Sequence, residues 1–432
     1  MNYIRHIIFE MRHQPLMTWL SIAGTAIAIF LIMSDFMIDR INMVEIAPES
    51  RRSRILYGFG ADLSSGDGNS ASSYLSFELA KELYSNLEGV ERVSYSVSDV
   101  TPTSISLPGK IPTTLPVKYV DNEYWNIYDY NFEEGSPFSL EESEAGVCNA
   151  IITRSTAEKL FGKGESPIGK ELLINRKSYT VTGVISNVNS IMNESYAEVF
   201  APHSSMQIEK IIWMEYLGRF CPILLLEDDT ETVNVQKQVE QRFKSFNARH
   251  KKDRVKLVYH SQPWDSETMA ELIGTNATPD LSTKHRMRYI AYAILLLIPA
   301  INLSSMTRSR LRRRVSEIGL RRAFGCTRTR IISDLITENL FISLIGGAIG
   351  LMLSIGFIIS FSNYFIQYGD WFCESIEQTA IRPSLSMLIN WQIFVAVMIF
   401  CFLLNILSAG IPACKAAFTN PAEAISGHNF NQ

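Results

Sequence analysis

The stretch from Gly164 to Lys170 reads Gly-Glu-Ser-Pro-Ile-Gly-Lys, which has the GxxxxGK spacing of a Walker A phosphate-binding loop. Such a loop needs Ser or Thr after the lysine to hold Mg²⁺, whereas this chain has Glu171, whose carboxylate would repel nucleotide phosphates. Pro167 also removes a backbone N–H from the stretch that would have to cradle phosphate. We therefore predict a turn here, between a helix over 154–161 and a strand over 171–175, and no nucleotide site.

No other combination of residues predicts catalysis or a bound cofactor. The sequence contains no HExxH and no GxSxG motif, and its seven histidines are scattered without metal-ligand spacing. Its six cysteines form no CxxC pair, and one disulfide between Cys148 and Cys221 is possible without being required by their spacing. We expect no catalytic residue, no metal and no cofactor in this chain.

The charges and apolar residues are distributed unevenly along the 432 residues. Residues 40–283 carry 24 Lys and Arg against 34 Asp and Glu, while the rest of the chain carries 16 against 10. The acidic middle excludes a nucleic-acid-binding protein with a basic field, and 47% apolar residues exclude a disordered chain. This pattern predicts a membrane protein with one large soluble domain.

Four apolar segments are long enough to span a bilayer core, which takes about 20 helical residues. They cover residues 16–38, 286–306, 335–361 and 385–411. Two polar residues lie inside them, Asn302 in the second and Glu338 in the third. A cleaved signal peptide is the alternative for the first segment, but its apolar run is longer than a typical signal core, so an uncleaved anchor is favoured.

Arginines between the second and third segments predict the orientation. Residues 307–334 hold nine of them: Arg308, Arg310, Arg312, Arg313, Arg314, Arg321, Arg322, Arg328 and Arg330. This loop is therefore expected in the cytoplasm, together with an interfacial helix over 1–15 and a tail over 412–432. Residues 40–284 and the loop 362–384 are then expected outside it.

The large domain over 40–284 mixes helix and strand signals, so we predict an α+β fold in which strands from both ends of the segment meet. An amphipathic helix is predicted over 77–89, ended by Gly89. Strands are predicted at 117–120, 148–153, 171–185 and 255–259. The Gly/Ser-rich stretch 58–73 is predicted to be a mobile loop.

The cytoplasmic loop contains the most specific segment of the sequence, Glu317-Ile-Gly-Leu-Arg-Arg-Ala-Phe-Gly325. It is typical of a basic amphipathic helix that ends at Gly325, with Thr327 placed to cap the next helix, which continues from Arg328 into the third span. The alternative is that its arginines only fix topology and bind anionic lipid. From the residues alone both interpretations stay open.

Small residues four apart predict close helix packing within the membrane. Gly346 and Gly350 form such a pair in the third span, and Gly24 and Ala28 form one in the first.

Several motifs together resemble the FtsX/MacB-type ABC transporter permeases. These are EIGLRRAFG (317–325) followed by TRTRIISDLITENLFISLIGGAIGLMLS, and Ile411-Pro-Ala-Cys-Lys-Ala-Ala with Asn420-Pro-Ala-Glu-Ala-Ile near the end. VDNEYWNIYDYNFEEGSPF (120–138), STAEKLFGKGESPIGKELLI (155–174) and YTVTGVISNV (179–188) resemble the MacB-type extracytoplasmic domain. Residues 40–116 and 204–284 match this pattern by position alone.

The resemblance implies an α-helical membrane protein of four transmembrane helices with a large α+β extracytoplasmic domain between spans one and two. It implies a mechanotransmission permease in the bacterial cytoplasmic (inner) membrane, acting as a homo- or heterodimer. It assigns ATPase coupling to Glu317, Gly319, Arg321, Arg322, Ala323 and Gly325. Since the chain has no Walker A before its first span, we expect the ATPase to be a separate polypeptide.

The function expected from this resemblance is ATP-driven movement of the outer domain that exports or extracts a peptide, lipid or lipoprotein-like substrate. Membrane lipid is an expected partner, and a periplasmic adaptor or outer-membrane channel is a further one; nucleic acid is not. An FtsX-like transmitter that activates a cell-wall hydrolase is the alternative, although its outer domain is usually smaller. A receptor or enzyme unrelated to ATP would leave the arginine-rich segment unexplained.

Overall fold

The computed structural model describes most of the chain, and its parts fall into two compact units. The described residues are 15–42, 45, 47–65, 70–98, 100–188, 192, 194–206, 215–252, 254–270, 280–297, 301, 320, 324–367 and 391–418. A helical unit comprises residues 1–41, 282–362 and 382–432, and an α+β unit comprises residues 42–281 and 363–381.

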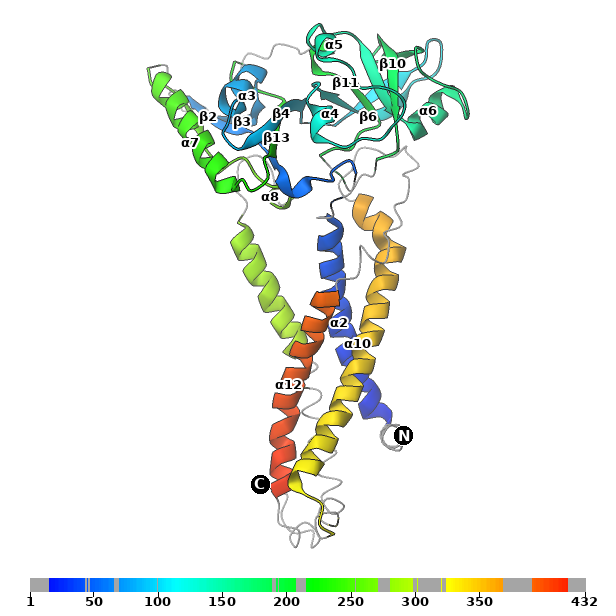
Figure 1. The fold of residues 1–432 in the computed structure, drawn as a ribbon, viewed down its shortest axis with the longest axis vertical. Helices are drawn as coiled ribbons and strands as arrows, with labels where there is room; N and C mark the ends of the chain where they lie inside the picture. Colours follow the sequence, from blue (N-terminus) through cyan, green and yellow to red (C-terminus); the bar gives the residue numbers. More distant parts are fainter. Residues whose placement is uncertain are drawn as a thin grey trace. The chain divides into compact units, whose positions relative to one another are not determined.

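The helical unit contains the helices α2 (Pro15–Asn42), α10 (Arg328–Gln367) and α12 (Trp391–Phe418), and a helix over residues 281–297 (Figure 1). Pro15 occupies the first position of α2, where its missing N–H leaves no helical bond unmade. Among the described residues, two stretches are long and apolar enough to cross a membrane, Thr18–Arg40 and Thr329–Phe361, and Trp391–Leu403 is a shorter apolar helix. The number of four spans therefore stays a prediction.

Helix α10 is a single continuous helix of 40 residues. At a rise of 1.5 Å per residue it is about 60 Å long, twice the thickness of a bilayer core. It begins at Arg328, where the sequence predicts a helix to start, and it continues without a break to Gln367; that this helix is the third span stays a prediction.

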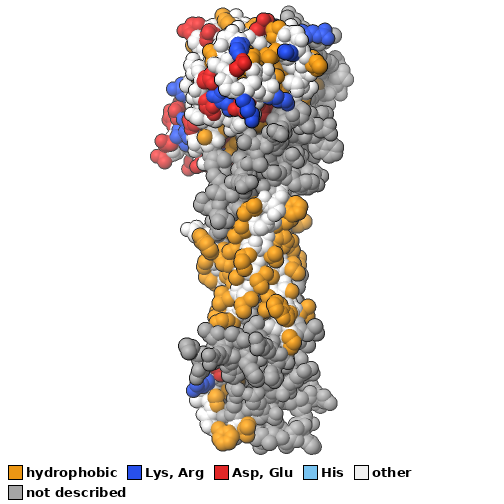
Figure 2. Space-filling model, turned by 90° about the vertical axis from the view of Figure 1, so that its right-hand side faces the viewer, with side chains coloured by type: hydrophobic (Ala, Val, Ile, Leu, Met, Phe, Trp, Pro, Cys, Tyr) orange, Lys and Arg blue, Asp and Glu red, His pale blue; other side chains and the backbone are white. Residues whose placement is uncertain are grey.

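Hydrophobic side chains dominate the described surface of the helical unit, whereas acidic and basic side chains gather on the α+β unit (Figure 2). On α2, Trp19, Leu20 and Ile27 are exposed, while Ile22, Ile29 and Met33 are buried. Exposed apolar residues on a helix of this length are expected where lipid replaces water.

The first sheet of the α+β unit is built from both ends of the domain. Its strand order is β1-β13-β3-β2-β14, with β4 paired to β13 and β12 paired to β3, and every pairing is antiparallel. The strands are β1 (Ile55–Tyr57), β2 (Ala61–Ser65), β3 (Ser70–Leu75), β4 (Val90–Val97), β12 (Leu217–Gly218), β13 (Phe220–Leu226) and β14 (Val255–Val258). The predicted meeting of the two ends of the segment is thus confirmed.

The second sheet is inserted into the first, between β4 and β12, and it closes on itself. Its order is β7-β10-β8-β11-β6-β5-β9, and β9 pairs with β10 as well as β5. The strands are β5 (Thr101–Ser106), β6 (Thr113–Val120), β7 (Phe132–Gly135), β8 (Asn149–Thr153), β9 (Glu171–Ile174), β10 (Lys177–Ile185) and β11 (Val199–Pro202). Closure leaves few unpaired strand edges, which protects the domain from edge-to-edge association.

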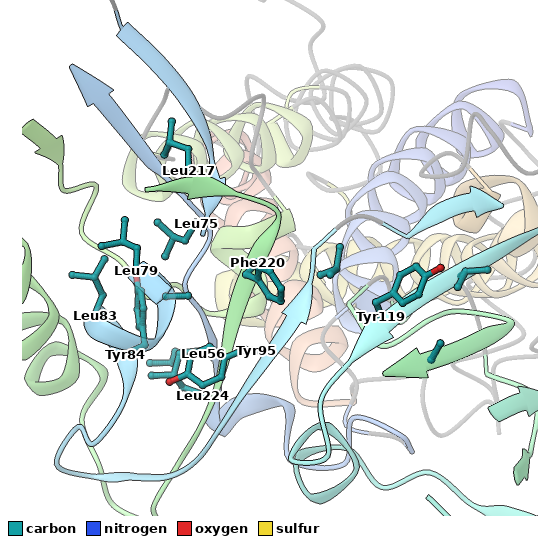
Figure 3. Close-up of a cluster of buried hydrophobic side chains, with 14 of the residues drawn as sticks. Leu56, Leu75, Leu79, Leu83, Tyr84, Tyr95, Tyr119, Leu217, Phe220 and Leu224 are labelled. Atoms are coloured by element: carbon teal, nitrogen blue, oxygen red, sulfur yellow. The ribbon is translucent and has the colours of Figure 1, made fainter. Parts of the chain in front are cut away.

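Helices and short 3₁₀ turns cover these sheets. They are η1 (Arg52–Arg54), α3 (Phe77–Tyr84), α4 (Tyr124–Ile127), α5 (Leu140–Glu144), α6 (Arg154–Phe161), η2 (His203–Ser205), α7 (Thr232–Arg249) and α8 (Ser266–Ala270). Helix α3 places Leu79 and Leu83, one turn apart, in a core with Leu75 of β3 and Leu224 of β13 (Figure 3). The same buried cluster continues to Tyr119 of β6, so the two sheets share one core.

The stretch 58–73 was predicted to be a mobile loop, and this prediction is wrong. It contains β2 and the start of β3, which pair with each other, and β2 also pairs with β14. Ala61 and Leu63 are buried. The alternation of these small apolar residues with Asp62 and Ser64 is the period-two signal of a strand, which the Gly and Ser content concealed.

The predicted helix over 77–89 is shorter than expected, because α3 ends at Tyr84. Arg242 of α7 donates hydrogen bonds to the carbonyl oxygens of Glu82 (3.2 Å) and Asn86 (2.9 Å), which lie at and beyond the end of α3. A guanidinium that satisfies these carbonyls replaces the glycine stop that the sequence suggested. Gly89, with φ of 81°, lies in the turn before β4 instead.

The possible disulfide between Cys148 and Cys221 is not formed. Both are free thiols; Cys148 packs against one buried cluster, and Cys221 belongs to another, with Ile223 and Tyr57. Both therefore act as small apolar side chains.

We predict that His203 makes the α+β unit less stable as the pH falls. Its ring contacts the rings of Phe77 and Phe220, at centroid distances of 5.1 and 5.4 Å, and burial lowers its pKa to about 4. Between pH 6.5 and 4 the unfolded chain therefore binds a proton that the folded chain does not, so stability falls by about 2 kcal/mol from pH 7.5 to 5. Thermal unfolding of the solubilised chain at both pH values should show this loss, and His203→Gln should reduce it. An unchanged pH dependence in that variant would refute the assignment.

Candidate functional site

Two groups of residues predicted from the sequence lie along or just before helix α10, those of the cytoplasmic elbow and those of the small-residue face. Of the elbow residues, Gly325 is described, while Glu317, Gly319, Arg321, Arg322 and Ala323 lie outside the described residues. Gly325 has φ of 88°, a conformation that favours glycine, and the preceding Phe324 donates its N–H to the carbonyl of Leu320 (3.1 Å). A helical turn thus ends at Gly325, as predicted.

The next helix, α10, starts three residues later at Arg328. The carbonyl oxygen of Thr327 accepts hydrogen bonds from the N–H groups of Arg330 (3.2 Å) and Ile331 (3.4 Å), so Thr327 is the residue before the first turn of α10. Phe324 is 84% exposed and Leu320 is 53% exposed. The described part of the elbow therefore exposes two apolar side chains.

Gly346 and Gly350 lie on the face of α10 that contacts α2. A Cβ atom added at Gly350 would lie 2.6 Å from the carbonyl oxygen of Ala26 and 2.9 Å from Cβ of Ile29. One added at Gly346 would lie 2.8 Å from Cβ of Thr25. Residue numbers rise in the same direction along both helices at these contacts, so α2 and α10 run parallel. Their backbones come this close only because glycine has no side chain.

Ser354 continues the same face one turn further and was not among the residues predicted from the sequence. Its single hydroxyl proton is shared between two carbonyl acceptors, that of Phe30 on α2 (3.0 Å from Oγ) and that of Gly350 on its own helix (2.9 Å). The signal was present, because Gly346, Gly350 and Ser354 are spaced four apart. On α2, Gly24 is half-buried and Ala28 is buried, while Thr25, Ala26 and Ile29 meet the glycines of α10.

A second face of α10 contacts α12. A Cβ atom at Gly347 would lie 2.4 Å from Sδ of Met398, and Leu351 and Ile358 of α10 share a buried cluster with Val397 of α12. Helix α10 is therefore packed between α2 and α12.

Polar side chains are buried in the first part of α10. Glu338 is 7% exposed, and its neighbours Asn339 and Ser343 are buried too. On α2, Thr18, Ser21 and Thr25 are buried. Ionisable groups inside a membrane span are costly and usually have a role, so Glu338 remains a candidate functional residue, while Asn302 lies outside the described residues.

The Walker-like stretch has the geometry of a turn. The N–H of Gly169 donates to the carbonyl of Val181 (2.8 Å), and Lys170 pairs with Glu165 (2.7 Å). The chain then continues into β9, whereas a phosphate loop leads into a helix whose N–H groups face the anion. The predicted turn between a helix and a strand is confirmed. Among the described residues no group of His, Cys, Asp and Glu is placed to hold a metal ion.

These features define the class: a helical unit with two candidate membrane spans, and an α+β domain inserted in the sequence after the first of them. Two family models match, the MacB-like periplasmic core domain over residues 18–242 and the FtsX-like permease C-terminal domain over residues 289–421. The first covers just over half of the chain. The chain belongs to the FtsX/MacB-type ABC transporter permeases.

Curated relatives have similar domains in chains of different length. The chain is 25% identical over 346 residues to the uncharacterized ABC transporter permease YknZ of Bacillus subtilis, covering 78% of this chain and 77% of the relative. It is 26% identical over 239 residues to the pyoverdine export ATP-binding/permease protein PvdT of Pseudomonas syringae, covering 55% of this chain and 34% of the relative. It is 22% identical over 333 residues to the macrolide export ATP-binding/permease protein MacB 2 of Yersinia pestis, covering 77% of this chain and 44% of the relative. The chain thus spans less than half the length of these two ATP-binding/permease proteins.

Two solved structures are also similar. The periplasmic region of MacB from Actinobacillus actinomycetemcomitans matches at a TM-score of 0.37 and 17% identity, covering 53% of this chain and 95% of that one. A domain of a putative permease from Porphyromonas gingivalis matches at a TM-score of 0.38 and 16% sequence identity. The match covers 50% of this chain and 90% of that domain. The family assignment rests on the family models.

Proposed function

We propose that this chain is the permease subunit of an ABC transporter whose ATPase is a separate cytoplasmic polypeptide. In this proposal, ATP-driven closure of the ATPase moves the outer domain, which exports or extracts a peptide, lipid or lipoprotein-like substrate. Family membership supports the permease role. The relative YknZ is named a permease alone, whereas PvdT and MacB are named ATP-binding/permease proteins, which supports a separate ATPase here.

The observation that carries the coupling mechanism is the continuity of α10 from the elbow through the membrane. Force applied near Arg328 would reach Gln367, because both residues belong to one continuous helix. The contacts of Gly346, Gly350 and Ser354 with α2 would make α2 move together with α10. A helix without a break transmits displacement with little loss to bending.

The elbow offers contacts suited to a protein partner. Arg321 and Arg322 supply planar donors for carboxylates of an ATPase, and Phe324 adds an exposed apolar ring. Gly319 and Ala323 are four apart and allow close approach, and Glu317 can pair with Arg321 one turn later. We assign these residues and Gly325 to ATPase coupling.

The proposal includes four spans, formed by α2, a segment that begins with helix 281–297, α10 and α12, with both termini in the cytoplasm of a bacterial inner membrane. A dimer of two permease chains, homo- or heteromeric, would place two elbows against two ATPase subunits. Contact with an adaptor or an outer-membrane channel is a further part of the proposal.

We predict that impermeant thiol reagents distinguish the two sides of the membrane. In a chain whose native cysteines are replaced by serine, a cysteine at position 65 or at the exposed position 110 should be labelled on spheroplasts, whereas one at position 311 should be labelled only after permeabilisation. The reason is the positive-inside effect of the nine arginines. Labelling of position 311 on intact spheroplasts would contradict the orientation.

The proposed function is tested by comparing the phenotypes of two mutant strains of the bacterium. Deleting this chain and inactivating the Walker A lysine of its partner ATPase should give the same phenotype, because neither subunit moves the outer domain alone. A phenotype of the deletion that survives in the ATPase variant would show an ATP-independent role.

A further inference from the structure

Four polar side chains join α2 to the helix over 281–297 within the helical unit. Both guanidinium ends of Arg288 contact the carboxylate of Asp39, Nη2 to Oδ1 at 3.0 Å and Nη1 to Oδ2. Nε of Arg288 lies 3.5 Å from Oδ2 of Asp35, and the hydroxyl of Tyr292 donates a hydrogen bond to the same carboxylate. The carboxylate of Asp35 and the carboxylate of Asp39 thus both contact the helix over 281–297.

The spacing makes this contact a two-point attachment. Asp35 and Asp39 are four residues apart on one helix, and Arg288 and Tyr292 are four apart on the other, so each pair lies on one helix face. Asp39 meets Arg288 and Asp35 meets Tyr292, which requires the two helices to run antiparallel.

Apolar packing continues below the polar contacts. The ring of Tyr292 lies 5.2 Å from that of Phe36, and Ile32 shares a buried cluster with Leu296. The contacts therefore extend over about two helical turns.

Two of the charges in this group, those of Arg288 and Asp39, are shielded, whereas the side chain of Asp35 is 46% exposed. Arg288 and Asp39 are 20% and 26% exposed, and Lys284 adds a second positive charge near Asp39. Asp35 follows Pro15 by 20 residues, or about 30 Å, which places it near the outer boundary of a bilayer core. There a bidentate pair is stronger than in water, while an unpaired carboxylate is costly.

The position along the chain gives the attachment its significance. The helical and α+β units divide at residues 41 and 42, where α2 ends, and again at 281 and 282, where the next helix starts. These two helices are therefore the chain's connections to the large domain over 42–281, and their separation sets the separation of its two attachment points.

We propose that Asp35, Asp39, Arg288 and Tyr292 form a latch that holds the outer ends of α2 and helix 281–297 together as one rigid pair. In the mechanism proposed above, on which this step rests, the pair carries the outer domain as a unit, so displacement of α2 reaches both attachment points at once. Without the latch the two helices can separate. Displacement of α2 then moves one attachment point of the outer domain without moving the other.

The test measures the distance between the two helices in the full chain, in lipid nanodiscs without an ATPase. Spin labels at positions 31 and 290, exposed sites on the two helices, report the distance distribution in a chain with native cysteines replaced by serine. Arg288→Gln should at least double the width of the distribution, whereas Arg286→Gln, which removes the same charge from an exposed site on the same helix, should leave it unchanged. The exchanged pair Asp39→Arg with Arg288→Asp should restore the narrow distribution.

An unchanged distribution in Arg288→Gln would overturn the latch, as would equal broadening in Arg286→Gln. A second measurement separates this outcome from failure of the proposed function. With the ATPase present, Arg288→Gln should still bind it yet lose most ATP-driven function, about tenfold or more. If no ATPase binds the unmodified chain, the proposed function fails, while the distance measurement still decides the latch.

Discussion

Leucine in place of Gly350 should strongly destabilise the helical unit. Its Cβ alone would lie 2.6 Å from the carbonyl oxygen of Ala26, so α2 and α10 would have to move apart. Overpacking of this kind costs about 1–3 kcal/mol, and separation also breaks the hydrogen bond from Ser354 to Phe30. Thermal unfolding of the detergent-solubilised chain should show the loss, and Gly346→Leu should act in the same direction.

The matched control lies on the same helix. Gly356 has nothing within 4 Å of an added Cβ, so Gly356→Leu adds the same side chain without a clash. This variant should unfold within a few degrees of the unmodified chain. If Gly350→Leu and Gly356→Leu are equally stable, α10 does not pack on α2 through its glycines, and the rigid path through the membrane is refuted.

Reversing the charge of Arg321 and Arg322 should abolish ATPase binding without affecting membrane insertion. Seven arginines would still mark residues 307–334 as cytoplasmic, so the topology should be retained. Two glutamates would repel the carboxylates that we expect on the ATPase, a change of several kcal/mol at a buried contact. Co-purification of the ATPase with the chain measures the effect directly.

The control for this charge reversal lies in the same loop. Arg312→Glu with Arg313→Glu makes an identical change of charge outside the segment 317–325, and we expect ATPase binding to persist. Loss of binding in both double variants would favour a general electrostatic effect, and retention in both would leave the arginines as topology signals only.

The sequence predicted those elements whose signal is local. Strand β8 was predicted from its β-branched residues, and the turn around Pro167, with helix α6 before it, from the mismatch to a Walker A loop; each signal lies within about ten residues. Helix α3 was predicted too long because its end depends on Arg242, which lies more than 150 residues further along the chain. The hairpin of β2 and β3 was missed because pairing with the distant β14 stabilises residues of weak strand propensity.

The candidate site was predictable to a similar degree. Gly346 and Gly350 were found by their spacing, but the spacing does not reveal which helix they meet. The pairing of Asp35 and Asp39 with Arg288 joins residues about 250 positions apart in the sequence. Taken alone, each of these residues indicates only that an apolar segment ends near it. Interactions of this kind follow from the fold and leave no periodic trace in the sequence.

Affinity purification of the membrane complex from the native bacterium, followed by mass spectrometry, tests the central claim most directly. A tag on this chain should recover a separate ABC ATPase in amounts comparable to the chain itself, and the Arg321→Glu and Arg322→Glu double variant should lose it. Recovery of the chain in a folded, membrane-inserted state without any ABC ATPase would contradict the claim that this permease is driven by a separate subunit.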